Sequence, residues 1–332
     1  MNTAKKLMAL LLVMLALTAC HDSKDEPADL QDYDILMITH AMYGHLICNF
    51  QGDTVYEGEP WRFIHHLESE GKDWYAVIAR SDVYSNYNYT VIKNGGPDIF
   101  STYDEVFSMQ IDHGDIYLMQ LNDEQHPNQI WITKNSRLIY SVEDNDVFSP
   151  RWMRVKDGDV VLTGPARSSR ACYWKNGKLI DIPGVEGPME SGCYVAWEGN
   201  NELLGFSRDK NGQPGYLLNG ERNDIDLARV THVEFINGKP VIVGQKIVED
   251  RSVAVTVIDG EAHVLSPYDG SHVKKMVKRG NSVFYYVSVF SNAPTYSYGR
   301  DDNERIYKDL TLLDKPLIVL NNGILDFTAI ER

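Results

Sequence analysis

Glycine turn signals recur along this chain at a nearly constant interval. In one series an apolar stretch ends at a glycine and another strand-like stretch follows at once, with successive glycines 39 to 44 residues apart, at Gly71, Gly114, Gly158, Gly199, Gly238, Gly280 and Gly323. A second series keeps step with the first, at Gly52, Gly95, Ser136, Gly177, Gly220, Gly260 and the Asp302-Asn303 pair. Two phased series of one period predict a repeat architecture.

Each repeat contains four short apolar stretches. The clearest unit has them at residues 151–155, 160–162, 171–174 and 179–182, with turns at Gly158 and Asn176-Gly177. Asn-Gly suits a two-residue hairpin because both central residues of a type I′ turn need positive φ. The same signal stands at Asn94-Gly95, Asn219-Gly220 and Asp259-Gly260. Valine, isoleucine and aromatic residues around the turns are typical of strands, so each unit predicts two β-hairpins.

Four-stranded repeats of this length are typical of a β-propeller, whose sheets pack radially around a channel. A β-helix has shorter repeats, and a sandwich does not keep one phase along a whole chain. The sequence therefore predicts an all-β fold, a seven-bladed β-propeller with four-stranded blades, as one domain over residues 33–332. Six complete units run from about Pro60 to Leu312. We expect strands from both ends, within residues 33–56 and 316–330, to share one blade and close the ring, which leaves no open sheet edge.

The N-terminus has the layout of a secretory signal over residues 1–19. Lys5 and Lys6 precede the apolar run 7–17, which is too short to span a bilayer. The tetrad Leu17-Thr18-Ala19-Cys20 resembles the lipobox of bacterial lipoproteins, which implies cleavage before Cys20 and acylation of that residue. The resemblance implies a membrane partner through the lipid and an outer-membrane location. An ordinary signal peptide is the alternative interpretation.

A polar, proline-interrupted stretch follows the cysteine, so residues 20–32 are expected to form a lipidated acidic tether. Within it, Lys24-Asp25-Glu26 resembles the signal that sends lipoproteins of Bacteroidetes-type bacteria to the cell surface. A bland acidic linker would have the same composition. Cell-surface exposure is therefore a hypothesis.

The repeats also resemble a family of propeller repeats. The sequence Tyr-Trp-Lys-Asn-Gly-Lys at residues 173–178 is similar to the repeat common among bacterial secreted and lipid-anchored propeller proteins. Residues 132–137 and 216–221 match the same repeat less fully. The resemblance covers most of the chain. It implies architecture, and no specific enzyme family is recognised.

Composition limits the partners. The formal net charge is −15, and loss of residues 1–19 with their two lysines makes it −17. Because nucleic-acid binding relies on basic surfaces, a nucleic acid is not expected as a partner. Cys48, Cys172 and Cys193 remain beside Cys20; a bridge between Cys172 and Cys193 and buried free thiols are the two alternatives.

Long connections are expected on one face of the ring and tight glycine turns on the other. The long ones include residues 81–88, 122–128, 164–170, 208–215, 248–252 and 291–297. Binding groups concentrate on loops held by a rigid scaffold. We therefore expect any site on the long-loop face.

Three arginines occupy equivalent places at that face. Arg80, Arg167 and Arg208 each lie nine residues after the first glycine of their unit. Fork-shaped guanidinium groups suit carboxylate, sulfate or phosphate ligands. The competing interpretation is that they brace the blades by pairing with acids such as Asp82 and Asp209.

Aromatic residues gather in the same loops. Tyr84, Tyr87, Tyr268 and Tyr296 are candidate ligand-binding residues because flat rings suit sugars or protein partners. The alternative is that they are strand tyrosines with a solvated hydroxyl.

No catalytic motif stands out. The sequence contains no Gly-x-Ser-x-Gly, no phosphate loop, and no Cys-x-x-Cys or His-x-x-x-His spacing for zinc, so no cofactor, metal or catalytic residue is predicted. His65 and His66 are expected to point to opposite faces of a strand. The resulting hypothesis is a non-catalytic, lipid-anchored binding or scaffold module for a glycan or an envelope protein. The alternative is a glycan-active hydrolase or lyase with its site at the long-loop mouth of the channel.

Overall fold

The sequence repeats become antiparallel sheets in the computed structural model. The structure describes residues 32–332 except 42–43, 59–61, 82–86, 122–127, 146, 167–169, 187–188, 190–191, 208–210, 267–268, 289–304, 309–310 and 313–323. Residues Asp32–Arg332 form one compact unit. The expected signal peptide, Cys20 and nearly all of the tether lie in residues 1–31, outside the described residues. Within the described part of the chain, no helix has the length and apolar character that crossing a membrane requires.

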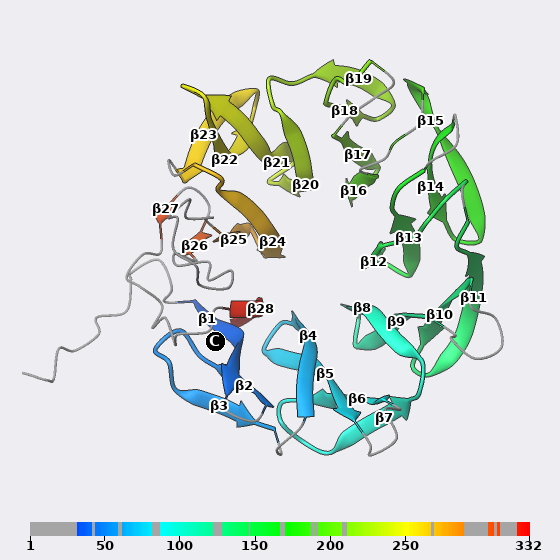
Figure 1. Ribbon diagram of the computed structural model, residues 1–332, viewed down its shortest axis with the longest axis vertical. Helices are drawn as coiled ribbons and strands as arrows, with labels where there is room; N and C mark the ends of the chain where they lie inside the picture. The colour runs from blue at the N-terminus through cyan, green and yellow to red at the C-terminus, as the bar shows by residue number, and fades with distance from the viewer. Residues whose placement is uncertain are drawn as a thin grey trace, which may run out of the picture. The chain divides into compact units, whose positions relative to one another are not determined.

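The described strands form seven sheets of four strands each, arranged as a β-propeller (Figure 1). The first three sheets in chain order contain β4 (Arg62–Glu70), β5 (Asp73–Ser81), β6 (Tyr87–Lys93) and β7 (Asp98–Thr102); β8 (Glu105–Asp112), β9 (Asp115–Leu121), β10 (Gln129–Lys134) and β11 (Arg137–Glu143); and β12 (Trp152–Lys156), β13 (Asp159–Thr163), β14 (Arg170–Lys175) and β15 (Lys178–Glu186). The prediction of an all-β propeller with four-stranded blades is confirmed.

The next three sheets follow the same order. They contain β16 (Cys193–Glu198), β17 (Asn201–Phe206), β18 (Gly215–Leu218) and β19 (Glu221–Asp224); β20 (Arg229–Ile236), β21 (Lys239–Val248), β22 (Arg251–Ile258) and β23 (Glu261–Ser266); and β24 (His272–Arg279), β25 (Ser282–Ser288), β26 (Arg305–Lys308) and β27 (Thr311–Leu312). The first strand of each sheet contacts a strand of the preceding sheet.

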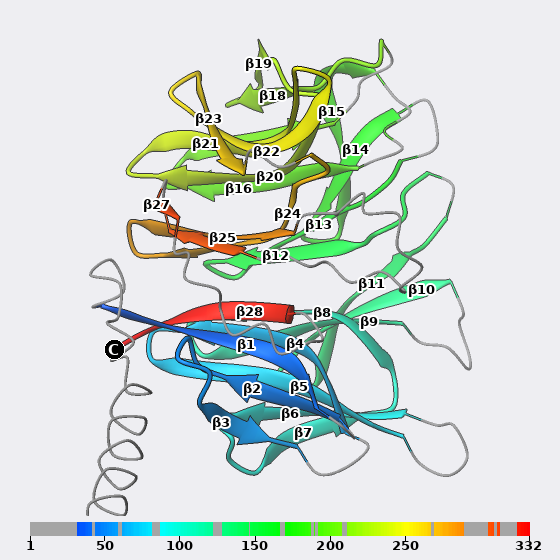
Figure 2. The same cartoon turned by 60° about the vertical axis from the view of Figure 1, so that its left-hand side comes forward.

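The closing sheet takes strands from both ends of the chain. Its order is β28 (Ile324–Glu331), β1 (Tyr33–Ala41), β2 (Gly44–Cys48) and β3 (Thr54–Glu57). β28 and β1 pair antiparallel, from Tyr33 opposite Glu331 to Thr39 opposite Ile324. β28 also lies beside both β4 and β24, so the ring closes (Figure 2). The expected sharing of one blade by the two chain ends is therefore observed, and the second C-terminal stretch expected at 316–323 lies outside the described residues.

The apolar core lies between neighbouring blades rather than within one sheet. One cluster joins Tyr117 and Ile130 of one blade to Val160 and Trp174 of the next. Equivalent clusters lie between other neighbours. Because both faces of a blade are covered, its inner strands are buried almost throughout, as in β25, where only Ser282 is partly exposed. This explains why the strands read as continuous apolar runs in the sequence.

The Lys-Asn-Gly signature has a structural role in the turns. Asn94, Asn135, Asn176 and Asn219 all have positive φ, as the hairpin prediction requires. In the unit that shows the signature best, the Asn176 side-chain oxygen accepts the Val160 N–H at 2.8 Å, and its amide donates to Asp159 at 2.8 Å. Lys175 forms an ion pair with the same carboxylate at 3.0 Å. The outer turn of each such blade is thereby tied to the inner turn.

Carboxylates connect the inner turns of successive blades. Glu70 accepts the backbone N–H groups of His113 and Gly114 at 2.6 and 2.7 Å. Asp112 accepts those of Asp157 and Gly158 at 3.1 and 2.7 Å in the following blade. Successive turn N–H groups form a small anion-binding concavity, which the carboxylate fills. These contacts link the tight turns of three successive blades.

We predict that deletion of residues 324–332 abolishes cooperative thermal unfolding. Without β28, the inner edge of β1 and the cores on both sides of it are exposed, and this loss exceeds the roughly 5–15 kcal/mol by which a native domain is stable. Circular dichroism during heating would measure this. Deletion of residues 20–31 serves as the control and should leave the transition in place; an unchanged transition in the 324–332 deletion would contradict ring closure by β28.

We predict that Asn176→Ala lowers the free energy of unfolding by about 2–3 kcal/mol. Alanine at positive φ costs roughly 1–2 kcal/mol, and loss of the side-chain hydrogen bonds adds about 1 kcal/mol. Asn176→Gly keeps the favoured backbone conformation and should lose only about 1 kcal/mol. Urea denaturation of both variants measures the difference; equal losses would show that the backbone conformation is unimportant.

Candidate functional site

The first strands of all seven sheets line a central channel. The cavity has a volume of about 570 Å³ and is bordered by residues of β4, β8, β12, β16, β20, β24 and β28. Each first strand of a complete unit starts at the long-loop face and ends at a tight turn. Residues near strand starts, such as Trp152 and His272, therefore lie at the long-loop mouth.

Five of the first strands contain a β-bulge, which changes the direction of side chains along the channel wall. The pairing register shifts around one extra residue in β4, β8, β20, β24 and β28, at His65, Phe107, Thr231, Lys274 and Leu325. A bulge re-aims side chains and is common beside binding sites. His65 and His66 both line the channel, as do Lys274 and Lys275. The register shift at His65 interrupts the strict alternation on which the expectation of opposite faces for His65 and His66 rests.

The channel carries an excess of positive charge. Among the described residues, its lining contains six lysines and arginines, Arg154, Lys156, Lys274, Lys275, Lys278 and Arg279, against the carboxylates Glu68, Glu234 and Asp326. The whole chain has a formal charge of −15. The channel is thus a local region of opposite sign, which favours anions in the focused field of a concave site.

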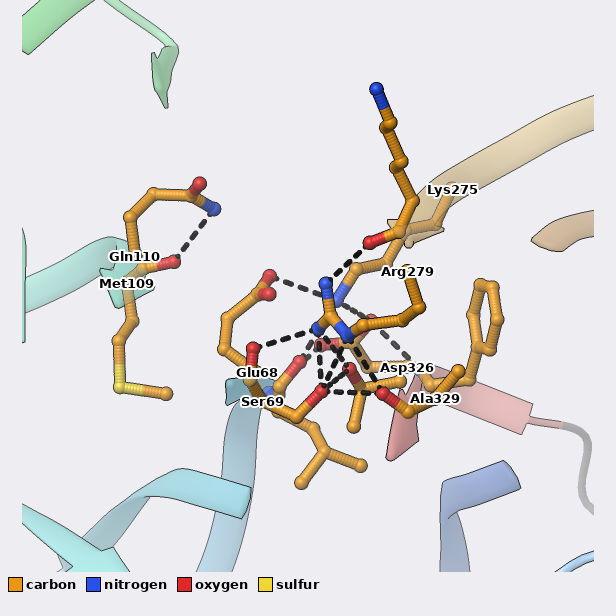
Figure 3. Close-up of polar contacts among 12 residues, drawn as sticks. Glu68, Ser69, Met109, Gln110, Lys275, Arg279, Asp326 and Ala329 are labelled. Carbon is orange, nitrogen blue, oxygen red and sulfur yellow. Dashed lines mark hydrogen bonds and ion pairs between the residues drawn. The ribbon is translucent and has the colours of Figure 1, made fainter. Parts of the chain in front are cut away.

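Two of these cations hold the closing strand in place. Lys275 pairs with Asp326 at 2.8 Å and Glu68 at 3.1 Å (Figure 3). Arg279 donates to the Ser69 and Ala329 carbonyl oxygens, both at 2.8 Å. Burial acts to lower the pKa of Lys275, but the two carboxylates outweigh it and the pKa lies above its ordinary value. These groups join β24, β4 and β28 and are structural.

Two further cations cross the channel nearer the tight turns. Arg154 forms an ion pair with Glu234 and donates to the Val195 carbonyl at 3.3 Å, so it connects β12 to β16 and β20. Lys278 pairs with Glu198 at 3.0 Å, from β24 to β16. Hydrogen bonding and charge from Lys278 hold the pKa of Glu198 below its ordinary value. These links join β12, β16, β20 and β24 across the channel.

An aromatic stack forms one wall of the long-loop mouth. The Trp152 and Tyr194 rings lie 5.4 Å apart, and the Tyr194 and His232 rings lie 5.6 Å apart. Trp152 is 43% exposed although it is a large aromatic residue. The three residues border a second cavity of about 430 Å³ that shares them with the channel. We call this cavity the mouth pocket.

The histidine at the base of the stack is buried and neutral. Burial, with the nearby charges of Arg154 and Lys275, lowers the pKa of His232 to about 4. Its Nδ1 atom is buried and has no hydrogen-bond partner among the described residues. An unpaired buried polar group is costly, so such an atom marks a place where a ligand or water is accommodated.

The structure describes the side chain of only one predicted site residue. Arg80 ends β5 and lies 3.8 Å from Asp98 on β7 of the same blade, with both side chains about half exposed. It does not line either cavity. This arrangement agrees with a bracing role, although within one blade rather than between blades. Arg167, Arg208, Tyr84, Tyr268 and Tyr296 lie outside the described residues, as does the side chain of Tyr87 in β6.

Other sequence expectations have definite outcomes. The long loop expected at 248–252 is a tight turn, because Glu249 and Asp250 both adopt positive φ between β21 and β22. Cys48, Cys172 and Cys193 are buried and form no disulfide among the described residues. The described residues contain one compact group of metal-ligand type, Asp112, His113 and Asp157. Both Asp112 oxygens already accept turn N–H groups, so this group is accounted for by blade contacts.

Sequence reasoning missed the mouth pocket. Trp152, Tyr194, His232 and Lys274 lie on four different first strands, and no local spacing links them. A signal was nevertheless present, since each residue falls in the first strand of a repeat unit. Aligning the units and reading only the channel-facing positions would have grouped these residues.

Comparisons with known proteins show distant similarity in fold alone. No protein-family model and no curated protein matches the chain. Apo AztD from Citrobacter koseri is similar with a TM-score of 0.44 and 10% identity, over 90% of this chain and 98% of that one. The β-propeller domain of the trilobed protease from Pyrococcus furiosus has a TM-score of 0.41 and 13% identity, over 80% and 98%. The acylaminoacyl peptidase of Pyrococcus horikoshii has a TM-score of 0.41 and 13% identity over 76% of this chain, which spans 52% of the peptidase.

We predict that His232→Gln reduces the loss of stability between pH 6.5 and about pH 4. An unfolded histidine has a pKa near 6.5, whereas that of folded His232 is about 4. The unfolded state therefore binds more protons in this window, and the free energy of unfolding falls as the pH falls, by up to about 3 kcal/mol from this group. Urea denaturation across the window compares wild type with the variant. Identical pH dependence would contradict a neutral, buried His232.

Proposed function

We propose that this protein is a non-catalytic, lipid-anchored binding module of the bacterial cell envelope, whose ligand is a glycan or a partner envelope protein. The exposed Trp152 ring, which lies beside Tyr194 at the channel mouth, carries the proposal. A tryptophan this exposed buries much surface only when a partner covers it, and such residues dominate binding energy at interfaces. The surrounding excess of positive charge favours an anionic partner.

The lipobox-like residues 17–20 support attachment to the outer membrane, with Cys20 as the lipidated residue. Several acyl methylenes at about 0.8 kcal/mol each, on two or more chains, give stable anchoring. The Lys24-Asp25-Glu26 sequence supports exposure at the cell surface. Protease treatment of intact cells tests this, since a protected protein would lie on an inner leaflet.

A glycan-active hydrolase or lyase is the second candidate. The Tyr194–His232 pair at the mouth favours it, because such side chains serve as acid and base. However, burial raises the pKa of Tyr194, so its phenol stays protonated and suits hydrogen bonding better than proton abstraction. The pair therefore fits ligand recognition better than catalysis.

We predict that Trp152→Ala weakens glycan or protein binding about tenfold or more, because an aromatic contact contributes roughly 1–1.5 kcal/mol beyond its buried area. The experiment is a glycan array and an envelope-extract pull-down with residues 20–332. Leu138→Ala is the matched control, since Leu138 is 52% exposed on the outer strand β11. Equal loss in both variants, or in neither, would contradict binding at the mouth; shortened products from a bound glycan would favour the enzyme.

A further inference from the structure

The mouth pocket combines cations with aromatic faces, and the described residues that line it include no acid. Ten described residues from β12, β16, β20 and β24, their neighbouring strands and a loop border it. Arg229 and Lys274 supply fixed positive charge, and none of the ten is Asp or Glu. In a chain of formal charge −15, two cations without an acid among the described lining residues favour an anion.

Arg229 is held at the rim by the backbone. It is the first residue of β20 and is exposed. Its carbonyl oxygen lies so close to Gly244 that a Cβ there would be 2.0 Å away, so only glycine permits this approach of β20 to β21. Among the described residues, no carboxylate forms an ion pair with Arg229. Arg229 and Tyr194 border the same pocket.

The remaining groups set the shape of the ligand. Trp152 and Tyr194 offer flat faces, while Lys274 lies over the Tyr286 ring at 5.4 Å on the opposite side of the mouth. The buried His232 Nδ1 is available for one hydrogen bond at the base. A volume of about 430 Å³ admits a small ring system rather than a folded surface.

We propose that the mouth pocket binds a hexuronate residue of an acidic glycan, with the carboxylate near Arg229 and Lys274 and the sugar ring against Trp152 and Tyr194. This inference rests on the proposed function and names its substrate class. A sugar acid has both a flat ring face and an edge carboxylate, whereas an aspartate or glutamate side chain has only the charge. Of these two ligands, the sugar acid is the one that uses both features of the pocket together.

The experiment uses residues 20–332 with trigalacturonate, a glucuronate-containing trisaccharide and fully methyl-esterified trigalacturonate. Isothermal titration calorimetry and tryptophan fluorescence measure binding. At least one acidic trisaccharide should bind, and its affinity should fall as the salt concentration rises. If trigalacturonate binds, its methyl ester should bind at least tenfold more weakly. Arg229→Met should weaken acid binding tenfold or more, Arg229→Lys less, and Arg137→Met on the outer strand β11 should have no effect.

The outcomes separate this inference from the function on which it rests. Three results would each overturn the hexuronate assignment. The first is equal binding of the acid and its ester, and the second is no effect of Arg229→Met in a variant that melts like wild type. The third is no binding of either acidic trisaccharide. If a neutral glycan or an envelope protein still binds in a Trp152-dependent way, the proposed function stands without it. Loss of all glycan and protein binding on the array and in the pull-down would reject the proposed function as well.

Discussion

Closure of the ring by β28 is the constraint on which the rest of the structure depends. The strand pairs with β1 through the backbone and is held from the channel side by Lys275 and Arg279 (Figure 3). Removing one partner of a buried ion pair leaves an uncompensated charge and costs about 3–5 kcal/mol. Blades bury their apolar faces only against neighbours, so an open ring would expose two of these faces. The channel and its mouth exist only because the two ends of the chain meet.

The two ends of the channel have different roles. Towards the tight turns, Glu70 and Asp112 join successive blades, and Arg154 and Lys278 connect strands across the cavity. Near the long loops, Trp152 and Arg229 remain exposed. A rigid base beneath an exposed aromatic and cationic mouth limits the ordering that a ligand must induce, which favours affinity. This division supports a binding role at the mouth.

The sequence predicted the strands, hairpins and terminal blade because these features follow from local signals. Asn176-Gly177 specifies its turn within two residues, and the glycine period counts the units without knowledge of their contacts. Of the predicted ligand-binding residues, the structure describes the side chain of Arg80 alone. Arg80 occupies an equivalent place in its repeat, but it lies beside Asp98 and outside the channel. Repeat position placed this residue at the correct end of a strand without showing where its side chain points.

By itself, the sequence determined the propeller repeat, the tight turns that separate its strands and the participation of both chain ends in one blade. Only the tertiary structure decided which residues share the channel. Bulges at His65, Thr231 and Lys274 change side-chain direction by one residue, and no pattern of period two records that change. Charge followed the same rule. The chain is acidic overall, yet distant strands bring Arg154, Lys274 and Lys275 together in the lining of the channel. Local turns depend on neighbouring residues, whereas a channel wall depends on residues that the closed ring alone brings together.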